Sequence, residues 1–174
     1  PLSSSAASVV YKRQISRLIL INFLSLCIVH KGLALGQALD LEFENKKLSK
    51  KKILDMYSRK TGKLFEFSFS APFILKDKSK KDIQFAKDYG ILFGLIFQVI
   101  DDLIDEIGTF KKIGKTPGKD IAQGKSTLLE LIGEKQVTDF CKNEINNFTK
   151  KHKKKLNQNP ILIKLLEFGM KRVL

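Results

Sequence analysis

KKDIQFAKDYGILFGLIFQVIDDLIDEI, residues 80–107, is the stretch that decides the fold. Its apolar residues recur at the three- and four-residue spacing of a helix, and the run 90–96 is apolar around the whole helix. Ser79 can cap this helix at its start, and Gly108 can end it. We therefore expect a long helix that is buried at the centre of the molecule.

The rest of the chain repeats the helical pattern, and no stretch alternates for long like a half-buried strand. Thr61 or Gly62 is expected to break or bend one helix, and Pro160 leads into the last one. The sequence predicts an all-α protein, with an irregular start at residues 1–10 and one helical domain over 11–174. The other expected helices cover residues 11–29, 33–44, 49–60, 64–75, 125–132, 134–156 and 161–174.

The composition of the 174 residues excludes several kinds of protein. Hydrophobic residues make up 43%, which is enough for a core and excludes a chain that is disordered throughout. Cys27 and Cys141 are too few for a disulfide framework and indicate a reducing compartment, so we expect a cytoplasmic protein. Because the chain has only two histidines, a bound metal would have to be held by carboxylates.

The net charge of +14 is compatible with a nucleic acid, an anionic membrane surface or a small anionic substrate. The lysine runs contain few aromatic residues on which bases could stack, which favours a solvated surface over a nucleic-acid interface. Residues 15–29 are apolar but shorter than the ~20 residues of a membrane span, so we expect a buried core helix there. The sequence thus predicts no nucleic-acid partner and no stable membrane insertion.

Three carboxylates interrupt the apolar surface at the end of the long helix. Asp101 and Asp105 lie one turn apart on one face, with Asp102 beside them and Gln98 one turn before. Burying like charges this close together is unfavourable unless a cation or basic side chains offset them. The following loop contains glycines and lysines, and Mg²⁺ held by one or two carboxylates commonly completes its shell with substrate phosphates. The pattern favours a magnesium and phosphate site over the alternative, a helix end whose aspartates face water.

The motif FQVIDDLID (97–105), followed by GKTPGKD (114–120) and GKST (124–127), resembles the second aspartate-rich region of trans-prenyl diphosphate synthases. These are the farnesyl and geranylgeranyl diphosphate synthase family. GQALDL (36–41) and YSRKTG (57–62) resemble two further motifs of the family, in the same order. The resemblance implies an isoprenoid-synthase-type helical bundle, of which this chain is the C-terminal portion. It also implies a homodimer and a Mg²⁺-dependent condensation of isopentenyl diphosphate with dimethylallyl, geranyl or farnesyl diphosphate.

The resemblance further implies roles for individual residues. Asp101, Asp102 and Asp105 would bind Mg²⁺, with Asp101 the strongest candidate and Asp102 in a less direct role. Thr61 and Gln98 would place dipoles near the developing carbocation. The residues expected around the diphosphate are Lys60, Lys115, Lys125, Gln37 and Asp40, and the expected catalytic set is Lys60, Thr61, Gln98, Asp101 and Lys115.

Two features of the family are missing from these 174 residues: the first aspartate-rich motif and the arginine pair that follows it. We therefore expect a fragment of a longer enzyme, inactive by itself; the family's residues that set product length lie in the missing part. One alternative is a non-catalytic truncated homologue or subunit that pairs with a complete synthase. A second is a basic helical protein whose binding to RNA or anionic lipid depends on salt and not on Mg²⁺.

Overall fold

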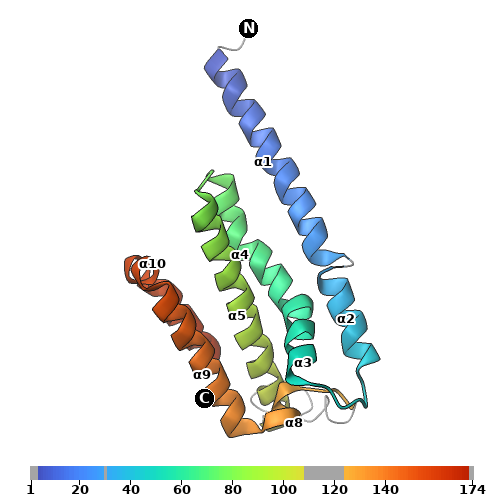
Figure 1. Ribbon diagram of the computed structural model, residues 1–174. Coiled ribbons are helices and arrows are strands. Elements are labelled where there is room, and N and C mark those ends of the chain that lie inside the picture. Colours follow the sequence, from blue (N-terminus) through green and yellow to red (C-terminus); the bar gives the residue numbers. More distant parts are fainter. Residues whose placement is uncertain (1–3, 30, 108–123, 173–174) are drawn as a thin grey trace.

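The structure is a computed structural model that describes residues 4–29, 31–107 and 124–172. Within these ranges every regular element is a helix, which confirms the prediction of an all-α protein. Figure 1 shows the longer helices side by side, with α2, α3 and α8 grouped at one end of the molecule. In chain order the elements are α1 (Ser4–Ile28), α2 (Leu33–Glu42), α3 (Lys50–Tyr57), the π-helix η1 (Ser58–Gly62), α4 (Lys63–Leu75), α5 (Lys80–Ile107), α8 (Leu128–Ile132), α9 (Glu134–Lys151), α10 (Lys153–Gln158) and α11 (Pro160–Lys171).

The central pair of helices is α4 and α5, which lie against each other along their length (Figure 1). α5 starts where the sequence predicts, and the Ser79 hydroxyl caps it by accepting a hydrogen bond from the Asp82 amide at 3.2 Å. Gly108, which was expected to end this helix, lies outside the described residues. Aromatic rings fill the space between the two helices. The Phe65 ring on α4 packs edge to face against the Phe93 ring on α5, with 4.9 Å between centroids. This packing fixes the position of the end of α5 that carries the aspartates.

The helix that contains the KTG motif is not broken at Thr61 or Gly62, so of the two outcomes expected, a break or a bend, the break is wrong; the α-helix changes there to a π turn. α3 continues through the π turn of η1 into α4, and Gly62 has ordinary helical dihedral angles (φ −59°, ψ −40°). Glycine is accommodated there because α5 packs closely against it: a Cβ atom on Gly94 would lie 2.7 Å from the Gly62 Cα. In η1, the consecutive residues Lys60 and Thr61 contact different helices, α2 and α5.

α1 differs from the prediction in its start and in its burial. It begins at Ser4, so residues 4–10, which were expected to be irregular, are helical. Residues 4–28 contain no glycine or proline that would end the helix. α1 is also not a buried core helix, because only one of its sides packs on α4 and α2. Cys27 on that side is 1% exposed, whereas Leu18 and Ile21 are 67% and 63% exposed. By length and composition alone, Gln14–Glu42 and Lys80–Glu106 could each cross a membrane. Within the apolar 18-residue stretch of each segment, 12% is buried in the first and 50% in the second.

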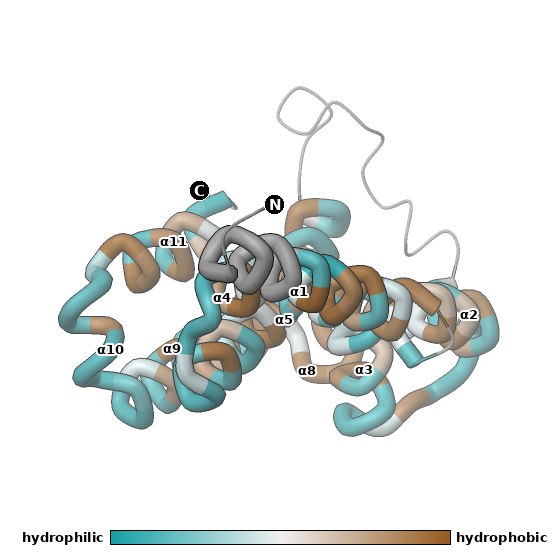
Figure 2. The backbone as a smooth tube through the Cα atoms, turned by 90° about the horizontal axis from the view of Figure 1, so that it is seen from above, coloured by the Kyte–Doolittle hydropathy of each residue, from teal (hydrophilic) through white to brown (hydrophobic). Residues whose placement is uncertain are grey.

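The C-terminal helices α9 and α11 pack on α5 and extend the core. The Tyr89 hydroxyl on α5 donates a hydrogen bond to the Leu162 carbonyl of α11 at 2.8 Å. The single helix predicted over 134–156 is divided at His152 (φ −116°, ψ 23°), which separates α9 from α10. Figure 2 shows that α10 is mostly hydrophilic, and Lys153 and Lys154 are exposed, as expected for a solvated lysine run.

Candidate functional site

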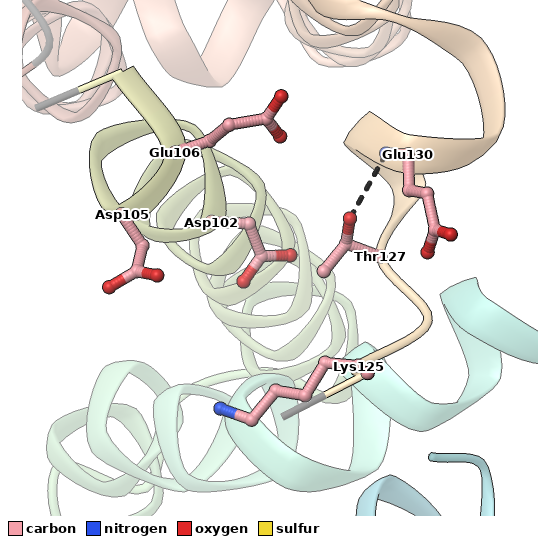
Figure 3. Close-up of a pocket in the computed structure, with 7 residues that line it drawn as sticks. Asp102, Asp105, Glu106, Lys125, Thr127 and Glu130 are labelled. Atoms are coloured by element: carbon pink, nitrogen blue, oxygen red, sulfur yellow. Dashed lines mark hydrogen bonds between the residues drawn. The ribbon is translucent and has the colours of Figure 1, made fainter. Parts of the chain in front are cut away.

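The C-terminal end of α5 and the segment before α8 enclose a pocket of about 180 Å³ (Figure 3). Asp102 and Asp105 contribute to its wall although they are only 6% and 2% exposed. Figure 3 shows the Lys125 side chain extending beneath these two carboxylates. The sequence analysis placed all three residues in one site, and the structure brings them together. The described residues that line the pocket are Asp102, Asp105, Glu106, Gly124, Lys125, Thr127 and Glu130.

Hydrogen bonds hold the Asp102 carboxylate from both of its oxygens. Gln98 Nε2 donates to Asp102 Oδ1 at 2.8 Å, and the Tyr57 hydroxyl donates to Oδ2. The same hydroxyl accepts a hydrogen bond from the Leu128 amide at 2.9 Å. Burial, followed by the charge of Asp102, raises the pKa of Tyr57 well above its usual value, so the phenol keeps its proton. A carboxylate held in this way has a fixed orientation toward the pocket.

Residues of the other two motifs join the same hydrogen-bonded region. The Thr61 hydroxyl of η1 donates to Gln98 Oε1 at 2.6 Å, which connects η1 to α5. Lys60 Nζ lies 2.5 Å from Asp40 Oδ2 in an ion pair between η1 and α2, and Asp40 is 7% exposed. The close packing depends on Gly36, because a Cβ atom there would lie 2.2 Å from the Lys60 amide nitrogen. The structure therefore brings the segments 36–41, 57–62 and 97–105 to one end of the molecule.

The segment that carries Lys125 is attached to the turn between α2 and α3. The Asn45 amide donates to the Gly124 carbonyl at 2.7 Å, and the Ser126 hydroxyl donates to the Phe43 carbonyl at 3.0 Å. Gly124 has a φ of +65°, a conformation that favours glycine. The Thr127 hydroxyl accepts from the Glu130 amide at 3.0 Å and caps α8, which therefore begins at Leu128 and not at the predicted residue 125. These bonds hold the backbone on both sides of Lys125.

Three of the expected site residues are placed differently from the others. Asp101 faces α11, where Arg172 Nη2 donates to Asp101 Oδ1 at 3.2 Å and the guanidinium lies 4.1 Å from the Phe97 ring centroid. Gln37 is exposed on α2, since its neighbours in the motif supply the contacts with η1. Lys115 lies outside the described residues.

The sequence analysis missed Tyr57 and Arg172 as residues that contact the aspartates. Tyr57 belongs to the YSRKTG segment (57–62) but was given no role there, because it occupies an apolar face of α3. A buried phenol needs a hydrogen-bond partner, and this was the available signal. Arg172 gives no comparable local signal, because its partner Asp101 is 71 positions away.

The donor set of the pocket fits a magnesium ion. Four carboxylates (Asp102, Asp105, Glu106 and Glu130) and one ammonium group line it among the described residues, so the lining is negatively charged. The expected trio of Asp101, Asp102 and Asp105 does not form one cluster, and the described residues include no group of three potential ligands that could hold a metal alone. Mg²⁺ commonly takes only one or two protein carboxylates and completes its shell with water and phosphate oxygens. Asp102 and Asp105 supply that number.

Comparison with known sequences identifies close relatives of this chain. The family model for Polyprenyl synthetase matches residues 4–166. The short chain isoprenyl diphosphate synthase of Methanocaldococcus jannaschii is 38% identical over 121 residues, which are 60% of this chain and 37% of that protein. The farnesyl diphosphate synthase of Bacillus subtilis is 36% identical over 126 residues, 71% of this chain and 43% of that protein. The chain thus spans less than half the length of these relatives.

Solved structures share the arrangement of helices. The geranyltransferase from Helicobacter pylori, solved in complex with magnesium and isoprenyl diphosphate, has a TM-score of 0.76 at 27% identity, over 89% of this chain and 51% of that one. Geranylgeranyl pyrophosphate synthetase from Pyrococcus horikoshii has a TM-score of 0.59 at 30% identity, over 91% of this chain and 49% of that one. The motifs, the all-α fold and these similarities agree: the chain belongs to the polyprenyl synthetase family, whose members include farnesyl and geranylgeranyl diphosphate synthases.

Proposed function

We propose that this chain carries the metal- and diphosphate-binding part of a short-chain prenyl diphosphate synthase of isoprenoid biosynthesis. Its reaction is the head-to-tail condensation of isopentenyl diphosphate with an allylic diphosphate: dimethylallyl, geranyl or farnesyl diphosphate. The observation that carries the proposal is the pocket in which Asp102 and Asp105 lie next to Lys125. Relatives whose names include farnesyl and geranylgeranyl diphosphate synthase support it.

The chemistry requires positive groups around a leaving diphosphate. The bond between the allylic carbon and the diphosphate oxygen breaks, the double bond of isopentenyl diphosphate attacks the resulting carbocation, and a proton is lost. Asp102 and Asp105 would hold Mg²⁺, which would act as a Lewis acid on the diphosphate oxygens. Asp101 would join them once its carboxylate separates from Arg172. The negative charge that develops on the diphosphate would be stabilised by the ammonium groups of Lys125, Lys60 and Lys115. This stabilisation lowers the barrier to bond breakage.

The hydrogen-bonded pair of Thr61 and Gln98 supplies neutral dipoles next to the pocket, because Gln98 is bonded to Asp102. Their oxygen atoms lie 2.6 Å apart, in contact with each other and with Asp102 through Gln98. Neutral oxygens can stabilise a nearby carbocation by their dipoles without donating an electron pair to form a covalent bond. Lys60 now forms an ion pair with Asp40. When substrate binds, Lys60 would exchange the Asp40 carboxylate for a diphosphate oxygen, since both are anionic acceptors.

We further infer that the protein is cytoplasmic, that it assembles as a homodimer and that it does not insert stably into membranes. The exposed apolar side of α1 supports the dimer, because an apolar surface of this kind commonly marks a protein interface. A non-catalytic subunit that pairs with a complete synthase is the second candidate.

The test is a condensation assay with the intact protein, isopentenyl diphosphate and each allylic diphosphate, with and without Mg²⁺. We predict Mg²⁺-dependent product formation that falls by at least about 10²-fold in Asp101→Ala and in Lys115→Ala. The first substitution removes a carboxylate that would hold Mg²⁺, and the second removes a positive group that would stabilise the leaving diphosphate. Circular dichroism should show a retained fold. Asp139→Ala, which removes an exposed carboxylate of α9, is the matched control.

The polypeptide of 174 residues by itself should bind diphosphate weakly and show negligible turnover. Full activity in both site variants would overturn the assignment of the site. Inactivity of the intact protein, combined with activation of a complete synthase on mixing, would favour the non-catalytic subunit.

A further inference from the structure

We propose that the Tyr57 hydroxyl is a positioning group that holds the Asp102 carboxylate and the first residue of α8 in one arrangement, and thereby sets the strength of metal–diphosphate binding. The inference rests on the proposed function, because it assigns a second layer of contacts to the same site. Tyr57 does not line the pocket and acts through the two groups to which it is hydrogen-bonded.

The geometry at Tyr57 connects three elements through one oxygen atom. The hydroxyl at the end of α3 donates to Asp102 on α5 and accepts from the Leu128 amide at the start of α8. Its partners are 45 and 71 positions away in the sequence, so the bonds connect parts of the chain that only folding brings together. Asp102 is fixed from its other oxygen by Gln98, which leaves the carboxylate little freedom to rotate.

The hydroxyl is not needed to fill space. Tyr57 is 2% exposed and its neighbours on the same helix, Ile53 and Met56, are buried apolar residues of the core. A phenylalanine ring would occupy the same volume without bringing a polar atom into this environment. Burying the phenol is favourable only with hydrogen-bond partners, and the partners here are a carboxylate of the pocket and the amide that follows the Lys125 segment.

The position of Leu128 extends the effect of Tyr57 to Lys125. The segment 124–127 is bonded to the turn between α2 and α3 at one end and enters α8 at the other. Tyr57 fixes the second end against Asp102, so the carboxylate and the ammonium group keep their relative positions. Loss of the hydroxyl would free the Asp102 carboxylate to rotate and leave the Leu128 amide buried without this acceptor.

The experiment compares Tyr57→Phe with Tyr89→Phe in the intact protein. Tyr89 is the matched control: it is 1% exposed, and its hydroxyl also bonds to a backbone group, the Leu162 carbonyl at 2.8 Å, but this partner does not line the pocket, whereas Asp102 does. Calorimetry with inorganic pyrophosphate and Mg²⁺ measures binding without turnover, and hydrogen exchange reports the Leu128 amide. Removing groups that orient a metal ligand typically weakens metal affinity by ~10–100-fold.

We expect Tyr57→Phe to weaken Mg²⁺–pyrophosphate binding by about 10–100-fold, to raise the Mg²⁺ concentration for half-maximal activity, and to accelerate exchange at Leu128. Tyr89→Phe should lower the melting temperature by about as much as Tyr57→Phe does, because each variant loses one buried hydroxyl. Unlike Tyr57→Phe, it should leave Mg²⁺–pyrophosphate binding unchanged.

Equal Mg²⁺–pyrophosphate affinity in Tyr57→Phe and Tyr89→Phe would overturn the inference and leave the proposed function intact. No Mg²⁺–pyrophosphate binding by the wild-type protein would overturn both. If Tyr57→Phe does not fold, nuclear magnetic resonance of the wild type replaces it: addition of Mg²⁺ and pyrophosphate should shift the Tyr57 hydroxyl and Leu128 amide protons. Unchanged resonances at saturating ligand would overturn the inference.

Discussion

Two side chains away from the pocket, the buried Cys141 and the half-buried His152, illustrate how burial controls single titratable groups in this fold. Burial, and to a lesser extent the Glu144 carboxylate, raises the pKa of the Cys141 thiol to about 12. The thiol therefore stays protonated and packs as a small apolar group. The His152 ring lies against those of Phe148 and Phe85, with centroids 4.4 Å and 5.1 Å away. Its Nε2 atom is buried without a hydrogen-bond partner among the described residues.

We predict that thermal stability decreases as the pH falls from 7 to about 5.5. Burial, followed by the charge of Lys151, lowers the pKa of His152; Lys155 lowers it further and Asp88 opposes the shift. The unfolded chain binds a proton at the ordinary histidine pKa of ~6.5, so protonation favours unfolding below that pH and has no effect well above it. Melting temperatures should fall over this range in the wild type and fall less in His152→Gln. Parallel curves for the two proteins would contradict the prediction.

Residues in short motifs could be predicted as members of the site, because the motif places them close together whatever the rest of the chain does. Thr61 and Gln98 are examples, and the structure joins them directly. Tyr57 lies in the 57–62 motif, but neither its contact with Asp102 nor the contact of Arg172 with Asp101 could be predicted, since these partners depend on how distant helices pack. Asp101 was expected beside Asp102 in one metal site, but the contact with α11 turns it to a different neighbour.

At the scale of helices, glycines determine how closely α5 approaches η1 and α4. A Cβ atom on Gly94 would lie 2.7 Å from the Cα of Gly62, and one on Gly90 would lie 2.5 Å from the Phe65 carbonyl oxygen. Both neighbours are backbone atoms, which cannot move aside as a flexible side chain can. A side chain at either position would separate the helices that carry Thr61 and Gln98.

Gly94→Ala should destabilise the protein by about 1–3 kcal/mol, since overpacking a tight helix contact costs this much and exceeds the gain in helix propensity. Urea unfolding followed by circular dichroism measures the change. Gly169→Ala is the control: a Cβ atom there would meet Ile96 Cγ2 at 3.8 Å, an ordinary contact, so this variant should gain up to ~1 kcal/mol. If the two variants have equal free energies of unfolding, α5 can move away from η1 and α4 without loss of stability, and the prediction is wrong.

The bounds of α5 could be predicted because its start, its apolar pattern and its length are all encoded locally. The continuous path from α3 through η1 into α4 could not. Glycine normally disfavours a helix interior, so Gly62 gave no local sign that the helix continues through it. The break at His152 was missed because helical periodicity continues on both sides of it.

At the scale of the whole molecule, one surface stays apolar after folding. α1 packs on α4 and α2 with one side, and its other side presents large aliphatic side chains. The sequence analysis expected this helix to be buried, because an apolar run gives no information about which neighbours are available to cover it. The large apolar residues of α1 that are exposed are Ile15, Leu18, Ile19, Ile21, Leu26 and Ile28.

If the homodimer forms through this surface, charges placed on it should dissociate the dimer. We predict that Leu18→Glu combined with Ile21→Glu converts the intact protein from dimer to monomer in sedimentation velocity, because glutamate carboxylates cannot be buried in an apolar contact. Ile161→Glu on α11 is the control, since Ile161 is 67% exposed, as Leu18 is. A dimer that persists in the double variant would place the interface elsewhere.

The contact between Arg172 and Asp101 has a practical consequence for handling the protein. Arg172 directly follows α11, so any peptide joined beyond position 172 begins beside the acidic end of α5. An affinity tag fused there would place new atoms next to the ion pair between Arg172 and Asp101. A tag that is cleaved off before the assay is therefore the better choice for kinetic work.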